Sequence, residues 1–129
     1  MKVAATGLLV ALWTPALAAE NVERHYSAAY AACMDRAGGV TPEMRFCISA
    51  EQERWEAHLN ATYRRVMAGL PLSRQASLRG EERSWLRRRE HVCASAGDDE
   101  AGGTLQPVEI DQCYLDETIR RTLSLRDYH

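Results

Sequence analysis

The sequence has almost no lysine and no surplus of positive charge. Lys2 is its single lysine, and the formal net charge of the 129 residues is −2. Nucleic acids and anionic membranes attract clusters of lysine and arginine, so this balance disfavours both as the main partner. A phosphate-binding glycine loop and the GxSxG motif of serine hydrolases are also missing. We therefore expect no enzyme, no catalytic residues, no cofactor and no nucleic-acid partner.

A hydrophobic run long enough to cross a membrane is missing as well. The longest run, Val3–Trp13, has eleven residues, whereas a membrane-spanning helix needs about 20. It follows a positive charge and precedes Ala16-Leu17-Ala18, which has the small-x-small form that signal peptidase accepts. We interpret residues 1–18 as a cleaved signal peptide rather than an uncleaved anchor, with cleavage one residue later as the near alternative. The expected product is periplasmic or secreted, with no lipidation cysteine and no stable membrane anchor.

Cleavage would leave residues 19–129, which suffice for a single domain and carry a net charge of −3. All four cysteines lie in this part, and an even count in a short exported chain indicates disulfides. A metal site is the competing interpretation, but there is no CxxC pair and no histidine at zinc-finger spacing. Four cysteines allow three pairings, and proximity across two helical hairpins favours Cys33–Cys47 with Cys93–Cys113. We expect no bound metal.

Apolar residues that recur every three or four positions predict four helices and no strand. The helices are expected over residues 20–37, 41 to about 70, 73 to about 93, and 107 to about 127. Gly38-Gly39 would end the first, Thr41 would cap the second, and Ser73 would cap the third. The connections are short except for an acidic loop over residues 96–106. The prediction is an all-α fold, a small disulfide-stapled array of about four antiparallel helices around the second and third.

Polar and aromatic residues lie on two helical stripes that are expected to face each other. They are Glu56, Asn60, Tyr63, Glu82, Trp85 and Arg89. We favour an interhelical polar network, in which Glu56 or Glu82 neutralises Arg89 and Tyr63 donates its hydroxyl, because buried polar groups need partners. The alternative is a recognition cluster for a partner molecule.

Two exposed charged segments are candidates for binding a partner. Asp98, Asp99 and Glu100 lie in the loop between the last two cysteines, where they could meet a basic protein or simply be solvated. They resemble half of a calcium loop but lack the alternating ligands and the distal glutamate. Arg87 and Arg88 could contact a carboxylate-rich partner, although an exposed charged helix face is the commoner explanation. His58 and His91 are expected at the surface or its rim.

The order of these residues resembles a known family. The second helix contains Leu59-Asn60-x-x-Tyr63, and the third contains Arg83-x-Trp85 and Arg89-Glu90-x-x-Cys93. Gly102-Gly103-Thr104 follows, and then Cys113 with Thr118, Arg121 and Leu125. Together these motifs resemble the lysozyme inhibitor LprI-like N-terminal domain family of bacterial envelope proteins, over essentially the whole of residues 19–129.

The resemblance implies a helical binding protein with a protein partner such as a lysozyme. Our first hypothesis is a periplasmic inhibitor that stops lysozyme-type muramidases by occluding a basic cleft. The alternative is an envelope interaction or accessory domain that binds another periplasmic protein and inhibits nothing.

Overall fold

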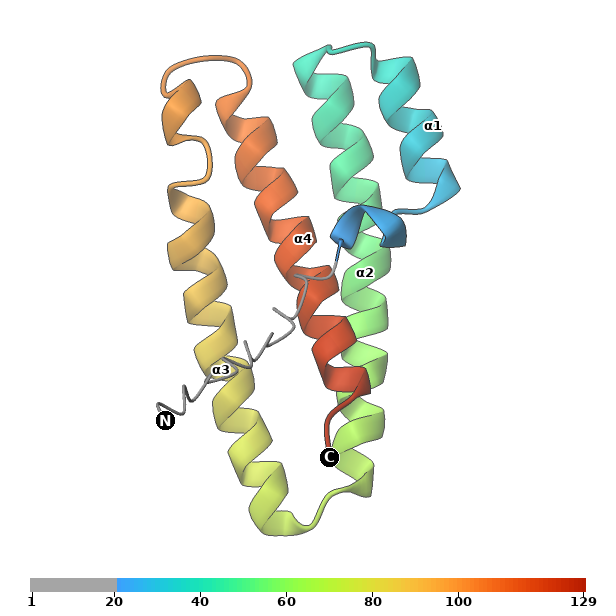
Figure 1. Ribbon diagram of the computed structural model, residues 1–129, viewed down its shortest axis with the longest axis vertical. Coiled ribbons are helices and arrows are strands. Elements are labelled where there is room, and N and C mark those ends of the chain that lie inside the picture. The colour runs from blue at the N-terminus through green and yellow to red at the C-terminus, as the bar shows by residue number, and fades with distance from the viewer. Residues whose placement is uncertain (1–20) are drawn as a thin grey trace, which may run out of the picture.

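The computed structural model describes residues 21–129, so the predicted signal peptide lies outside the described residues. Over these residues the chain is all-α, as predicted, and contains no strand (Figure 1). In chain order the elements are the 3₁₀ turn η1 (Val22–His25), α1 (Ala28–Ala37), α2 (Thr41–Gly69), α3 (Leu72–Ala94), the 3₁₀ turn η2 (Asp98–Glu100) and α4 (Gln106–Arg126).

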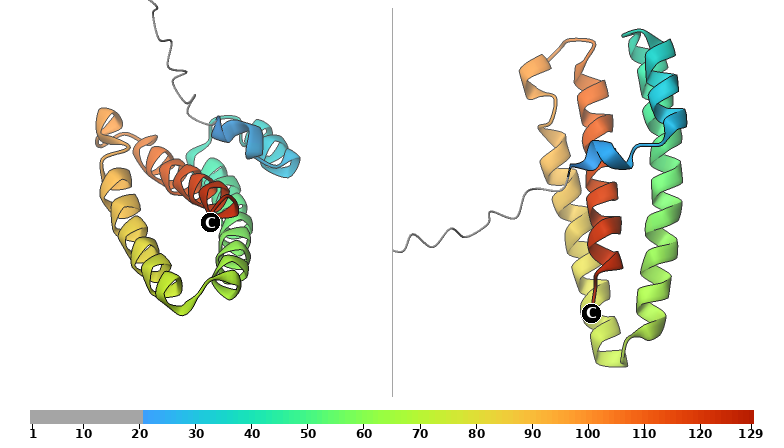
Figure 2. Two further views of the ribbon diagram at one scale, coloured as in Figure 1. Left: turned by 60° about the horizontal axis from the view of Figure 1, so that its bottom comes forward. Right: turned by 45° about the vertical axis from the view of Figure 1, so that its right-hand side comes forward.

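Helix α4 is the centre of the array. It packs against α2, α3, η1 and η2, and it lies between α2 and α3, which diverge from their connection at residues 70–71 (Figures 1 and 2). Its side chains Leu115, Thr118, Ile119 and Leu125 are fully buried. The expectation that the second and third helices form the centre is therefore wrong. Helix α3 has only three buried residues, too few to be the middle of a bundle.

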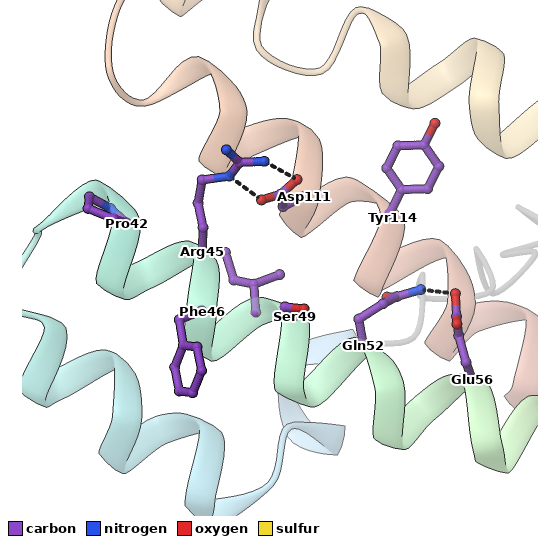
Figure 3. Close-up of a pocket in the computed structure, with 9 residues that line it drawn as sticks. Pro42, Arg45, Phe46, Ser49, Gln52, Glu56, Asp111 and Tyr114 are labelled. Atoms are coloured by element: carbon purple, nitrogen blue, oxygen red, sulfur yellow. Dashed lines mark hydrogen bonds and ion pairs between the residues drawn. The ribbon is translucent and has the colours of Figure 1, made fainter.

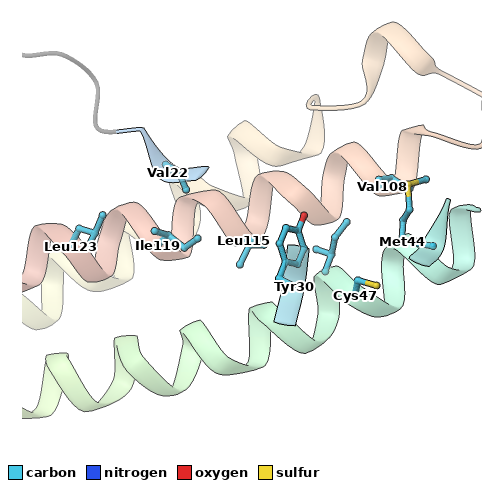
Figure 4. Packing of buried hydrophobic residues seen from close by; sticks show 10 residues of the cluster. Val22, Tyr30, Met44, Cys47, Val108, Leu115, Ile119 and Leu123 are labelled. Carbon is cyan, nitrogen blue, oxygen red and sulfur yellow. The ribbon is translucent and has the colours of Figure 1, made fainter. Parts of the chain in front are cut away.

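Two hydrophobic clusters hold the helices together. The larger joins η1, α1, α2 and α4 through Tyr30, Ile48 and Leu115, among others (Figure 4). The smaller joins α2, α3 and α4, and consists of Leu59, Leu78, Trp85 and Leu125 with partly buried neighbours. Because α4 contributes to both clusters, it connects the two halves of the molecule.

The first predicted helix is in fact two elements. A turn at η1 is followed by extended backbone, and α1 begins only at Ala28. The Ser27 side chain caps α1 by accepting a hydrogen bond from the Tyr30 amide (3.0 Å). The Glu51 carboxylate of α2 in turn accepts bonds from the Ser27 amide and hydroxyl, at 2.9 and 2.7 Å. This contact from another helix fixes the start of α1.

Both capping predictions for the long helices are wrong, although the helices themselves are where they were expected. Thr41 is the first residue of α2 rather than its cap, and its hydroxyl donates to the Thr104 carbonyl (3.2 Å). Ser73 lies inside α3, which begins at Leu72 without a side-chain cap. The α2–α3 turn is instead closed by Gln75, whose amide donates to two carbonyls at the end of α2. Gly38 adopts the left-handed conformation (φ 54°) at the end of α1, as predicted.

The two disulfides join the pairs of cysteines that proximity favoured. Cys33–Cys47 links α1 to α2 with a Cα–Cα distance of 5.7 Å. Cys93–Cys113 links the end of α3 to α4 across the acidic loop, with a Cα–Cα distance of 5.5 Å. Both distances are ordinary for a disulfide. Each bridge therefore fastens a helix that has few buried residues of its own to a long, well-packed one.

Candidate functional site

A groove of about 420 Å³ lies between α2 and α3, and we call it the α2–α3 groove. Its walls include all six residues of the predicted polar network, together with Leu59, Arg79, Arg83 and Leu86. The groove exists because α2 and α3 diverge while α4 holds them apart (Figure 2). The two stripes face each other as the sequence suggested, but across an opening rather than within a closed core.

Arg89 is held at the bottom of this groove by contacts from three sides. Its Nη1 donates to Thr118 Oγ1 on α4 (2.9 Å), and its guanidinium lies 4.7 Å from the centre of the Trp85 ring. Tyr114 flanks it at 5.2 Å. Of the two glutamates expected to neutralise it, Glu56 lies 3.9 Å away, at the limit of an ion pair. The positive charge of Arg89 is thus fixed in place mainly by aromatic rings and a hydroxyl.

Glu82 has a different partner from the one the sequence suggested. Its carboxylate accepts from Arg121 Nε on α4 at 2.8 Å, with Nη2 at 2.7 Å. Both side chains are mostly buried. Arg121 and Thr118 were not predicted to join the network, although they lie three positions apart and therefore on one face of α4. That spacing is the signal that could have found them.

Asn60 and Tyr63 do not join the network. Asn60 is exposed and Tyr63 is half-buried, and neither side chain has a hydrogen-bond partner within residues 21–129. The expected donation by the Tyr63 hydroxyl is therefore wrong for the described part of the chain. The reason is the divergence of α2 and α3, which leaves these groups facing the groove instead of an acceptor.

A second hollow of about 540 Å³ adjoins the first and shares Glu56 with it. Figure 3 shows the Arg45–Asp111 ion pair on one side, with Arg45 Nε 2.6 Å from the carboxylate. On the other side the Gln52 amide donates to Glu56 (2.8 Å). Phe46, the single phenylalanine of the chain, lies at its edge and is 70% exposed. No motif in the sequence predicted this hollow.

Glu51 forms a buried polar centre that the sequence analysis also missed. Besides Ser27, its carboxylate accepts from Arg54 (2.7 Å) and from Trp55 Nε1 (3.2 Å), and the residue is only 3% exposed. Burial alone would raise the pKa of Glu51, but the hydrogen bonds from Arg54 and Ser27 outweigh it and hold the pKa below its usual value. This centre is structural, because every group around it belongs to the fold.

Two tyrosines, one directly after η1 and one in α1, form a second missed network with α4. Tyr26 donates to Asp116 (2.6 Å), and Tyr30 donates to the Gln112 side chain (2.7 Å). Gln112 in turn donates to the Tyr26 oxygen (2.8 Å). Burial, and then the bond to Asp116, raise the pKa of Tyr26. Burial and the same carboxylate raise the pKa of Tyr30 to about 12. Tyr26 and Tyr30 are four positions apart in the sequence, and so are Gln112 and Asp116. This spacing was the signal available in the sequence.

The predicted partner-binding residues are all exposed. Asp98, Asp99 and Glu100 form η2, where successive backbone hydrogen bonds wind the loop into turns. Arg87 and Arg88 lie outside the α2–α3 groove, and Arg87 donates to Ser84 (3.2 Å). The structure therefore leaves these five residues accessible but does not bring the acidic and basic sets into one site.

The histidines are spread over the described chain. His25 and His58 each contact the Trp55 ring, at 6.3 and 5.4 Å between ring centres. His91 and His129 are exposed. Among residues 21–129 no group of histidine, cysteine and acidic side chains could hold a metal ion. None of the helices in this range is long and apolar enough to span a membrane.

Comparison with known proteins identifies the family. The family model described as lysozyme inhibitor LprI matches residues 33–125, which include both disulfides and the whole α2–α3 groove. The chain belongs to the LprI family. An uncharacterised protein of Rhizobium meliloti (strain 1021) is 24% identical to this LprI-family chain over 98 residues, covering 66% of this chain and 70% of the relative. No solved structure matches the present chain. Membership of this family points to protein binding of the lysozyme-inhibitor kind rather than to catalysis.

Proposed function

We propose that the protein acts in the periplasm or outside the cell, where it binds lysozyme-type muramidases and inhibits them by occluding their cleft. The observation that supports this most is the LprI family match over residues 33–125. Determining the N-terminus of the exported protein by mass spectrometry tests the compartment, and we expect Ala19 to be its first residue.

The acidic turn η2 is our candidate for the contact that blocks the cleft. It lies beyond the end of α3, in the connection to α4, and the Cys93–Cys113 bridge joins the two helices at its base (Figure 1). Its carboxylates at positions 98–100 are exposed and suit a basic surface, such as the rim of a lysozyme cleft. A loop held on a rigid support loses little conformational freedom on binding, which favours tight association.

The test is an inhibition assay with the oxidised protein and chicken-, goose- and invertebrate-type lysozymes on bacterial cell walls. We expect near-stoichiometric inhibition of at least one type, weakened at high salt because exposed charges are screened. D98A/D99A/E100A should inhibit at least tenfold less well. The control D35A/E53A/E90A removes three exposed carboxylates elsewhere and should inhibit like the wild type. No inhibition of any type at micromolar protein would contradict the proposal.

The second candidate function is an accessory domain that binds another periplasmic protein without inhibiting it. The exposed turn and groove would serve this role equally well. Affinity capture from periplasm with the wild type and with D98A/D99A/E100A separates the two. A captured partner that is not a muramidase, and that is lost with the triple variant, would favour the accessory role.

A further inference from the structure

The α2–α3 groove contains four polar side chains that have no partner within the described chain. Two are uncharged, Asn60 and Tyr63, and two are guanidinium groups, Arg79 and Arg83, one turn apart on α3. Elsewhere in the fold, most polar groups that face a neighbouring helix are paired, as the Glu51 and Tyr26 clusters show. Unpaired polar groups that converge on one hollow are typical of a binding site.

The rest of the groove is rigid and partly apolar. Glu82 is paired with Arg121, and Arg89 is bonded to Thr118, so these charges are committed to the fold. Trp85 is 6% exposed at the base, and Leu86 is 41% exposed on the wall. A ligand therefore meets a fixed apolar surface flanked by free donors, which is the usual composition of a specific site.

We propose that the α2–α3 groove binds an extended, carboxylate-bearing segment of a protein partner. A guanidinium binds a carboxylate through two parallel hydrogen bonds, so Arg79 and Arg83 would each bind an acidic side chain. The Asn60 amide offers both a donor and an acceptor, which matches the alternation of an extended main chain. An apolar side chain of the segment would then lie against Leu86.

This inference deepens the proposed function and rests on it for the identity of the partner. Glycoside hydrolases generally carry a pair of carboxylates beside the scissile bond, so acidic side chains are available around a muramidase cleft. Glu56 and Glu82 also line the groove, and they would repel a polyanion such as nucleic acid or an anionic lipid surface. Isolated carboxylates on a polypeptide fit this arrangement better than a continuous row of phosphates.

The deciding variant is R79A/R83A, with R65A/R126A as its matched control. The control removes the same charge from exposed arginines outside the groove, on α2 and α4. All four side chains are exposed, so both variants should keep the thermal midpoint and helix content of the wild type. Two measurements are made on each protein. One is inhibition of the muramidase, and the other is an amide NMR titration with a defined peptide.

The peptide probe is Gly-Ser-Glu-Leu-Glu-Ser-Gly with blocked ends, and its counterpart has lysine in place of both glutamates. We expect the acidic peptide to shift amides over residues 56–63 and 79–89, and the lysine peptide to shift none. R79A/R83A should weaken peptide binding and muramidase inhibition at least tenfold, while R65A/R126A stays within twofold of the wild type. A loss of peptide binding or of muramidase inhibition that is specific to R79A/R83A supports the proposed role of the groove.

The outcomes separate the two proposals. Muramidase inhibition that is equal in the wild type and R79A/R83A, together with no groove shifts at millimolar peptide, overturns the groove and leaves the proposed function intact. Equal binding of the lysine peptide also overturns the groove. Groove binding of the acidic peptide without inhibition of any muramidase overturns the proposed function and leaves the groove as a peptide site.

Discussion

At the scale of single residues, Glu51 shows how one buried carboxylate organises several elements. It connects the cap of α1 at Ser27 with Arg54 and Trp55 of its own helix. A hydrogen bond to a charged group contributes about 1.5–3 kcal/mol. Several such bonds meet at one side chain, so this residue should be among the most sensitive polar positions in the chain.

E51Q should lower the free energy of unfolding by about 2 kcal/mol at pH 7, because the amide cannot accept from all of these donors. Urea denaturation followed by circular dichroism measures the change. E53Q is the control, since Glu53 is exposed on the same helix, and it should stay within about 0.5 kcal/mol of the wild type. Equal stabilities of E51Q and the wild type would refute the central role of Glu51.

Glu51 also predicts that the difference in stability between the wild type and E51Q depends on pH in the acidic range. The pKa of Glu51 is lowered in the folded state, so its contribution is present above the unfolded pKa of about 4.3 and is lost as pH falls through the folded pKa. We expect the stability gap between the wild type and E51Q to shrink steadily from pH 5 downward. Denaturation curves at half-unit pH steps check this, and a gap independent of pH would contradict it.

Tyr30 predicts that the free energy of unfolding falls as the pH rises in the alkaline range. Its pKa is raised to about 12, so its stabilising effect is full below the unfolded pKa of about 10 and is lost between there and about 12. The free energy of unfolding should fall more steeply with pH in this range for the wild type than for Y30F. Absorbance at 295 nm follows ionisation directly, and it should show fewer late-ionising tyrosines in Y30F.

The residues of the candidate site were largely identifiable from sequence, but their partners were not. Helical spacing placed Glu82 and Arg89 on one stripe of α3, and both line the groove. The sequence could not show that Arg121 of α4 forms an ion pair with Glu82, because this pairing depends on the position of a third helix. The Glu51–Ser27 contact, which spans 24 positions, likewise leaves no local pattern.

At the scale of helices, α3 is the most weakly held of the three long ones. Its buried residues, Leu78, Trp85 and Cys93, form a single narrow seam, and it packs mainly against α4. The Cys93–Cys113 bridge therefore carries much of the attachment of its C-terminal end. Since α3 also forms one wall of the α2–α3 groove, this bridge sets the shape of the groove.

Removing either disulfide should cost about 3 kcal/mol, because both close loops of similar length. The local effects should differ. C93S/C113S should speed hydrogen exchange over residues 86–106, whereas C33S/C47S should speed it over residues 28–37. Exchange measured by mass spectrometry distinguishes the two variants. A uniform increase along the chain in both variants would show that neither bridge acts locally.

Helix positions were predictable where local signals agree, and the central place of α4 was not. Gly38 and Pro42 mark the α1–α2 boundary clearly. On α4, however, Thr118 and Thr122 are buried although their side chains are polar. Their hydroxyls donate back to the carbonyls of Tyr114 and Thr118, at 2.7 and 2.8 Å, which satisfies them without water. The spacing of apolar residues alone therefore does not mark this buried face of α4.

At the scale of the whole molecule, two bridges of about 3 kcal/mol each are large against the 5–15 kcal/mol that stabilises a typical domain. Full reduction should therefore lower the thermal midpoint by about 20 °C. Circular dichroism at 222 nm with and without a reductant measures this. Treatment of the oxidised protein with iodoacetamide is the control and should change nothing, since the described residues contain no free cysteine. A midpoint unchanged by reduction would contradict the prediction.

The position of α4 has a consequence for how the chain is made. The helix that completes both hydrophobic clusters, and that supplies the second half of the Cys93–Cys113 bridge, leaves the ribosome after the other described helices. Until residues 106–126 emerge, the face of α2 that packs against α4 has no partner, although α1 can already pack against another face of α2. A ribosome that stops early would thus release a product recognisable to proteases by its uncovered apolar surface.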